Sequence, residues 1–115
     1  MVKVGTDIVS IKRVKDSIEK FGDRFLDRFL SKSEQNLSSK VESIAGYWAS
    51  KEAISKALGC GIGKELSFLD IEIKKDSKNA PFFIIKNGKF KVRESSLSIS
   101  HESDYAIAVV ILILD

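Results

Sequence analysis

The sequence is poor in the two residues that most often bind zinc or crosslink a chain. Its 115 residues include a single cysteine, Cys60, and a single histidine, His101. One cysteine excludes an intrachain disulfide, which fits a protein kept in a reducing cytosol. One cysteine and one histidine also fall short of a four-ligand zinc site. We therefore expect a cytoplasmic protein without a disulfide framework or a structural zinc ion.

Long apolar segments, repeats and low-complexity tracts are missing as well. The longest apolar run, residues 105–114, is too short to cross a bilayer as a helix. The N-terminus lacks the apolar run and small-residue cleavage site of a signal peptide. No linker divides the chain, so we expect one domain over residues 1–115. The net charge of +3 favours anionic partners in general, and neither a membrane nor a nucleic acid is expected as a partner.

Apolar periodicity predicts an α+β domain, in which an N-terminal strand and helices are followed by an antiparallel β meander. A strand at residues 2–9 precedes two short helices, the first capped by Ser10 and ended by Gly22. Residues 31–34 and 39–42 both match a capping box. The second box is expected to begin a long helix, which Gly59 ends.

From Leu66 onward the apolar period changes to two, which predicts strands. Pro81 begins one of them, and Asn87-Gly88 is a strong hairpin signal. The last strand, residues 105–114, is apolar on both faces, so both faces should be buried. In so small a domain this pattern hints at a subunit interface.

The long helix carries two rows of side chains at four-residue spacing. One row consists of small residues, where another element can approach closely: Ala45, Ala49, Ala53 and Ala57. The other row contains Trp48, Glu52 and Lys56. One interpretation of this row is a solvated Glu–Lys pair, which contributes only about 0.3 to 0.5 kcal/mol. The other interpretation is a site for a metal ion and a phosphate.

Asp7 is a carboxylate within the apolar N-terminal stretch. It is either a turn or cap residue before the first helix, or a carboxylate held at the end of a strand. Asp7 and Glu52 together suit Mg²⁺, which takes one or two carboxylates and binds substrate phosphate oxygens. Lys56, one turn beyond Glu52, would neutralise charge on the same phosphate. This set is typical of phosphoryl or pyrophosphate-cleaving transfer.

Three other features leave alternatives open. His101 is either a structural residue at a strand end or a functional one. The charged helix faces that carry Arg13, Arg24 and Arg28 are either solvated or dock a partner. Cys60 is poorly supported as a nucleophile, because the sequence places no base beside it.

Five segments occur in the order and spacing of a known family. They are GTDIVSIKRV, FLSKSE, WASKEAISKALGCGIG, LSFLDIEI and LSISHESDYAIAVVI. On these motifs the chain resembles the holo-[acyl-carrier-protein] synthases, the short bacterial 4'-phosphopantetheinyl transferases. The resemblance covers almost the whole chain.

The resemblance implies an enzyme of fatty acid biosynthesis with the 4'-phosphopantetheinyl transferase fold. It would move phosphopantetheine from coenzyme A to a serine hydroxyl of apo acyl carrier protein and release adenosine 3',5'-bisphosphate. Mg²⁺ bound by Asp7 and Glu52 would stabilise charge at the coenzyme A pyrophosphate. Glu52, Lys56 and His101 would be catalytic, with His101 donating a hydrogen bond to a phosphate of coenzyme A. The base stays open between Glu52 and a water of the metal ion.

The resemblance also implies binding surfaces. Basic residues would dock on the acidic helix of the carrier protein, and the family is a homotrimer with active sites between subunits. The docking residues would be Arg13, Arg24 and Arg28. Coenzyme A would contact Lys56, Gly59, Gly61, Ser100 and His101.

Three positions depart from the family pattern. Tyr47 stands where the family usually has an arginine, and we expect the contact of that arginine to be lost or supplied by another residue such as Lys51. Cys60 replaces a threonine of the glycine-rich loop, and a thiol is a poor hydrogen-bond donor. Asn79 replaces the glycine of a Gly-x-Pro turn, so the turn type is expected to differ.

Two other function classes compete with the enzyme. A small basic binding module would use the arginines, and its binding would weaken steeply with salt without needing Mg²⁺. A structural oligomer would assemble through the last strand, and Glu52→Gln would then be silent. Both leave the joint presence of Asp7, Glu52, Lys56 and His101 unexplained.

Overall fold

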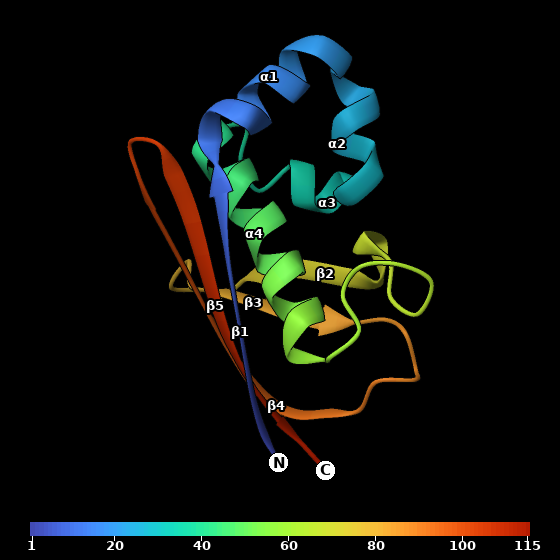
Figure 1. The fold of residues 1–115 in the computed structure, drawn as a ribbon. Coiled ribbons are helices and arrows are strands. Elements are labelled where there is room, and N and C mark those ends of the chain that lie inside the picture. Colours follow the sequence, from blue (N-terminus) through green and yellow to red (C-terminus); the bar gives the residue numbers. More distant parts are fainter.

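A long helix packed on a three-stranded antiparallel sheet forms the centre of the structure, a computed structural model that describes residues 1–115 (Figure 1). Three shorter helices lie at one end of the long helix. A second, two-stranded sheet runs crosswise to the long helix. In chain order the elements are β1 (Val2–Ser10), α1 (Ile11–Phe21), α2 (Asp23–Phe29), α3 (Lys32–Gln35), α4 (Val41–Ala57), the 3-10 helix η1 (Phe68–Asp70), β2 (Ile71–Lys75), β3 (Pro81–Ile85), β4 (Val92–Glu102) and β5 (Tyr105–Leu114).

The α+β fold class is confirmed, but the strands do not form one meander. The main sheet has the order β1-β5-β4, and β2 pairs only with β3 in a separate sheet. β1 pairs with β5 along its whole length, from Val2 opposite Ile113 to Ser10 opposite Tyr105. The apolar character of β1 and β5 allows this long-range pairing, and it brings the two ends of the chain together (Figure 1).

The row of alanines on α4 packs against the main sheet, as its spacing predicts. All four side chains are buried, and the backbone of β1 comes so close that a Cβ on Gly5 would overlap the carbonyl oxygen of Ala53. Small residues on both elements therefore bring β1 and α4 into direct contact. This contact fixes the position of Asp7, two residues after Gly5, relative to Glu52, the residue before Ala53.

Most of the predicted helix ends are confirmed. The Ser10 hydroxyl accepts the Arg13 N–H at the start of α1, and Gly22 ends that helix with φ 58°. Ser31 and Glu34 form the predicted capping box of α3.

The predicted start of the long helix is wrong by one residue, whereas Gly59 follows its C-cap in the left-handed conformation, as expected of the glycine that ends a helix. α4 begins at Val41 without a side-chain cap, because the Ser38 hydroxyl turns the chain by accepting the Lys40 N–H. It stops at Ala57, with Leu58 as its C-cap.

The outer face of the main sheet is apolar and exposed. Alternate residues of β5 are buried against α4, from Ala106 to Leu112. The other face of β5 exposes Tyr105, Ile107, Val109 and Ile111 by 40 to 52%, and β1 adds Val2, Val4 and Ile8. The expectation that both faces of the last strand are buried is therefore not met within one chain. No helix in the structure has both the length and the apolar character needed to span a membrane.

Candidate active site

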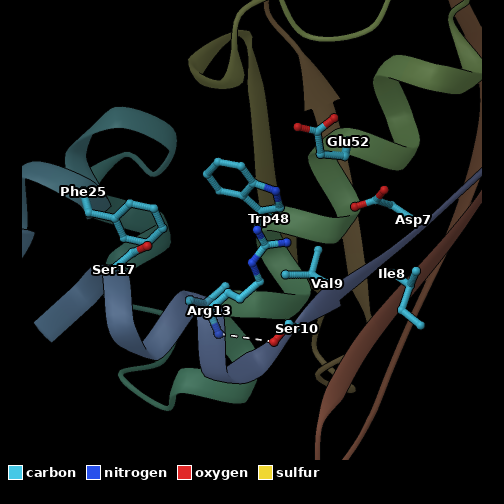
Figure 2. A pocket seen from close by; sticks show the side chains of 10 residues that line it. Asp7, Ile8, Val9, Ser10, Arg13, Ser17, Phe25, Trp48 and Glu52 are labelled. Atoms are coloured by element: carbon cyan, nitrogen blue, oxygen red, sulfur yellow. Dashed lines mark hydrogen bonds between the residues drawn. The ribbon is translucent and has the colours of Figure 1, made fainter. Parts of the chain in front are cut away.

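Two carboxylates from different elements face the same pocket. Asp7 comes from β1 and Glu52 from α4, and Figure 2 shows both side chains on the same side of Trp48. The pocket has a volume of about 380 Å³, is open to solvent, and is lined by residues of β1, α1, α2 and α4. Gly5 and Ala53, which bring the two backbones together, each lie within two residues of one of these carboxylates. The predicted pairing of Asp7 with Glu52 across two segments is thus observed.

The charges in this pocket are incompletely balanced. Lys56 Nζ lies 2.9 Å from Asp7 Oδ1 and also donates to the Thr6 carbonyl at 3.2 Å. The Glu52 carboxylate accepts no hydrogen bond and forms no ion pair. Burial raises the pKa of Glu52, the charge of Asp7 raises it further, and Lys56 opposes both effects. The interpretation of Glu52 and Lys56 as a simple surface ion pair is wrong, because Lys56 turns toward Asp7 instead.

The donor set fits a hard divalent cation. Two carboxylates meet in a half-buried pocket, one of them lacks any partner, and their mutual repulsion is what a cation would relieve. No group of three His, Cys, Asp or Glu side chains in the structure lies close enough together to hold a metal ion. Water and substrate oxygens would therefore have to complete the coordination, as is usual for Mg²⁺ bound by one or two carboxylates.

Aromatic side chains form one wall of the pocket. The rings of Phe25 and Trp48 are stacked with their centroids 5.8 Å apart, and Phe29 and Phe68 pack behind them. The sequence analysis did not identify Phe25 as a site residue. Its position one residue after Arg24 on the same short helix was the available signal.

The three arginines predicted to dock a partner lie on the side of the pocket formed by α1 and α2. Arg13 lines the pocket itself and reaches from α1 toward Trp48 (Figure 2). Arg24 and Arg28 are exposed on α2, the helix that supplies Phe25. None of the three forms an ion pair within the chain, so their charges remain available to an anionic partner.

The remaining predicted site residues lie away from this pocket. Gly59 and Gly61 follow the C-terminal end of α4 with φ values of 82° and 67°, which favour glycine. Ser100 and His101 lie on β4, at the opposite edge of the main sheet from β1. His101 lines a separate cavity of about 220 Å³ with Tyr47 and residues of the β2–β3 turn. A single chain therefore does not bring His101 to Asp7 and Glu52.

The positions that depart from the family pattern have clear structural roles. Tyr47 is 2% exposed, and its hydroxyl has no hydrogen-bond partner. Lys51 is fully buried in an ion pair with Glu34, so of the two alternatives for the arginine's contact, its replacement by Lys51 is not supported. Asn79 adopts φ 66°, so it takes the left-handed conformation that a glycine would take in this turn. Burial raises the pKa of the Cys60 thiol, which argues against a nucleophilic role.

Comparison with known proteins identifies the family. The model of the 4'-phosphopantetheinyl transferase superfamily matches residues 3–110. The holo-[acyl-carrier-protein] synthase of Nautilia profundicola is 55% identical over 111 residues, covering 96% of this chain and 98% of the relative. The chain belongs to the holo-[acyl-carrier-protein] synthases of the 4'-phosphopantetheinyl transferase superfamily.

Solved structures of holo-[acyl-carrier-protein] synthases have the same fold. The Helicobacter pylori enzyme in complex with coenzyme A is 52% identical, with a TM-score of 0.92 over 96% of this chain and 99% of that one. The Bacillus anthracis enzyme in complex with coenzyme A (3',5'-ADP) is 40% identical, with a TM-score of 0.81 over 96% of this chain and 94% of that one. The pocket described above therefore lies in a fold that is shared with these enzymes.

Proposed function

We propose that the protein transfers the 4'-phosphopantetheine group from coenzyme A to a serine hydroxyl of apo acyl carrier protein. The observation that carries this proposal is the pocket in which Asp7 and Glu52 converge, in a chain 52% identical to an enzyme solved with coenzyme A. The serine oxygen would form a bond to the β-phosphorus of coenzyme A. The pyrophosphate P–O bond would break, and adenosine 3',5'-bisphosphate would leave with the electron pair.

The charged residues in and beside this pocket would form a cation site and a set of positive charges. Asp7 and Glu52 would hold Mg²⁺, which when bound would offset the negative charge that develops on the pyrophosphate. Lys56 would donate from its ammonium to a phosphate oxygen, since its side chain is half exposed and ends beside Asp7. Arg13, on the opposite wall, would contribute a second positive charge.

Glu52 is the chain's own candidate to accept the proton of the attacking serine. Its carboxylate has no partner within the chain, and burial together with the charge of Asp7 raises its pKa, which makes it a stronger base than an ordinary carboxylate. Asp7 is less suited to that role, because Lys56 already donates to it.

A homotrimer with sites between subunits would complete the arrangement. The exposed apolar face of β1 and β5 is continuous across two adjacent strands, and such a face usually marks an interface. Assembly through this face would bring β4 of one copy near the pocket of another. Ser100 and His101 would then reach coenzyme A from the neighbouring subunit.

The carrier protein would dock beside the pocket. Exposed and unpaired Arg24 and Arg28 would meet an acidic helix of the carrier, so that the serine enters past Phe25. Replacing Arg24 by glutamate should raise the KM for the carrier protein several-fold and leave the KM for coenzyme A nearly unchanged, because charges at an interface rim mainly control encounter.

The deciding experiment is intact-mass analysis of apo acyl carrier protein incubated with the protein and coenzyme A, with Mg²⁺ or with a chelator. We expect the carrier to gain one phosphopantetheine group only with the metal ion. Asp7→Asn and Glu52→Gln should abolish the gain, whereas the exposed Glu94→Gln should not. No gain with the wild type would reject the function, and retained metal-dependent turnover in either pocket variant would reject the cation site.

A further inference from the structure

The most deeply buried charges in the protein lie outside the pocket. Lys51 and Glu34 are both 0% exposed, and Lys51 Nζ lies 2.8 Å from Glu34 Oε1. A buried ion pair is a weak source of stability, because removing two charges from water offsets most of their attraction. The significance of this pair therefore lies in the elements that its hydrogen bonds hold in position.

Lys51 joins three separate elements to α4. Its ammonium donates to the Phe29 carbonyl at the end of α2 at 2.6 Å, to Glu34 in α3, and to the Phe68 carbonyl at the start of η1 at 3.0 Å. A lysine ammonium has three protons, and each of them has an acceptor here. No donor is left over to bind a ligand.

Glu34 extends the connection to a fourth element. Its Oε1 also accepts the Ser31 N–H at 2.8 Å, and its Oε2 accepts the Ile73 N–H of β2 at 2.7 Å. Hydrogen bonds from α2, α3, η1 and β2 thus converge on a pair that is anchored in α4 next to Glu52.

The element that depends most on this pair is α2. It has seven residues, and a helix this short is not stable without tertiary contacts. The Lys51 ammonium binds the carbonyl of its last residue, where a positive charge also complements the helix dipole. The same helix carries Phe25 in the pocket wall and the exposed Arg24 and Arg28.

We propose that Lys51 and Glu34 are positioning residues that hold α2 in a fixed relation to α4, so that a carrier protein docked on α2 presents its serine to Asp7 and Glu52. This inference rests on the proposed function. Both side chains act at a distance from the reacting atoms, because they are sealed from solvent and saturated with protein contacts.

The test uses a double variant that removes both charges, so that an effect on the position of α2 can be distinguished from a general loss of stability. Lys51→Met or Glu34→Gln alone leaves one buried charge unpaired and should lower the melting temperature strongly. The double variant has no buried charge and should recover part of that loss. A matched control is Leu112→Ala, a fully buried position on β5 that loses stability through a cavity, remote from α2.

We expect the double variant to show about tenfold faster amide hydrogen exchange in α2 than the wild type. Its KM for carrier protein should rise about five- to tenfold, because the contacts of Arg24 and Arg28 with the carrier would weaken together. Its KM for coenzyme A should change by less than about twofold. Leu112→Ala should lose stability without changing the ratio of the two KM values. An unchanged carrier KM in the folded double variant, or a parallel change of both KM values as in the control, would overturn the inference.

The wild type provides a measurement that needs no variant. The Leu30 N–H, which donates to Leu26 at the end of α2, should be protected from exchange nearly as well as amides of α4. Exchange as fast as in an isolated peptide would overturn the inference even if the variants fail to fold. Absence of transfer by the wild type would instead reject the proposed function, so the two failures are distinguishable.

Discussion

Replacing Lys56 by methionine should strengthen the binding of a divalent cation and at the same time slow the transfer. Lys56 Nζ lies 2.9 Å from Asp7 Oδ1, so its ammonium already neutralises one of the two carboxylates. A cation that binds Asp7 and Glu52 has to compete with this ammonium. Methionine has a similar length but no charge, so it removes the competitor and also removes a donor to the substrate phosphate.

The size of the two effects follows from the exposure of the pair. The Lys56 side chain is 54% exposed and that of Asp7 is 16%, so solvent screens their attraction. Ion pairs of this kind contribute about 0.2 to 1 kcal/mol, which corresponds to about a 1.4- to fivefold gain in cation affinity. Transfer should fall about 100-fold, the usual effect of removing one donor that stabilises transition-state charge.

Titration calorimetry with Mg²⁺ measures the first effect, and intact-mass analysis of the carrier protein measures the second. Lys78→Met, in the exposed β2–β3 turn, is the control for the loss of one positive charge. Weaker cation binding by Lys56→Met would show that Lys56 supports the site rather than competing for it. Unchanged binding would show that the ion pair with Asp7 does not persist in solution.

Three further predictions test other parts of the structure. Tyr47→Phe should raise the free energy of unfolding by about 1 kcal/mol, measured by urea denaturation, because it removes a buried hydroxyl without a partner; a loss of stability would show that the hydroxyl is hydrogen-bonded. Val109→Glu should convert the proposed trimer to monomers in light scattering, because it places a charge in the exposed apolar face of β5, and an unchanged mass would contradict an interface on that face. Glu52→Gln should raise the melting temperature at pH 7, because the raised pKa of Glu52 means that its ionised form destabilises the folded state. This gain should vanish below the pKa of about 4.3 of the unfolded chain, where the carboxyl is protonated in both states, and a gain that persists there would contradict the cause.

Local signals in the sequence predicted the parts of the fold that depend on neighbouring residues. The cap at Ser10, the stop at Gly22 and the capping box from Ser31 to Glu34 each involve residues three or four positions apart. The alanine row predicted the close approach of another element, because its spacing is a property of one helix. The pairing of Asp7 with Glu52 was inferred from their chemistry, and the Gly5–Ala53 contact brings it about.

The parts that sequence reasoning missed depend on long-range contacts. α4 is buried around most of its circumference, so its pattern gives no indication of which charged residue points inward. Lys51 and Glu52 are adjacent, yet one is sealed in an ion pair and the other faces the pocket. The ion pair of Lys56 with Asp7 was missed for a related reason, because Asp7 is 49 residues away in the sequence. The separate β2–β3 sheet likewise follows from packing rather than from alternation.

The pairing of β1 with β5 has a consequence for how the protein is made. β1 is synthesised well before β5, its only strand partner, since Val2 pairs with Ile113 and Ser10 with Tyr105. A nascent chain therefore carries β1, with its exposed Val2, Val4 and Ile8, as an unpaired apolar edge until β5 has been synthesised. Contacts so distant in sequence form late and slowly, and exposed apolar edges favour aggregation during that time. We therefore expect chains that lack β5 to misfold through β1 and to depend on chaperones.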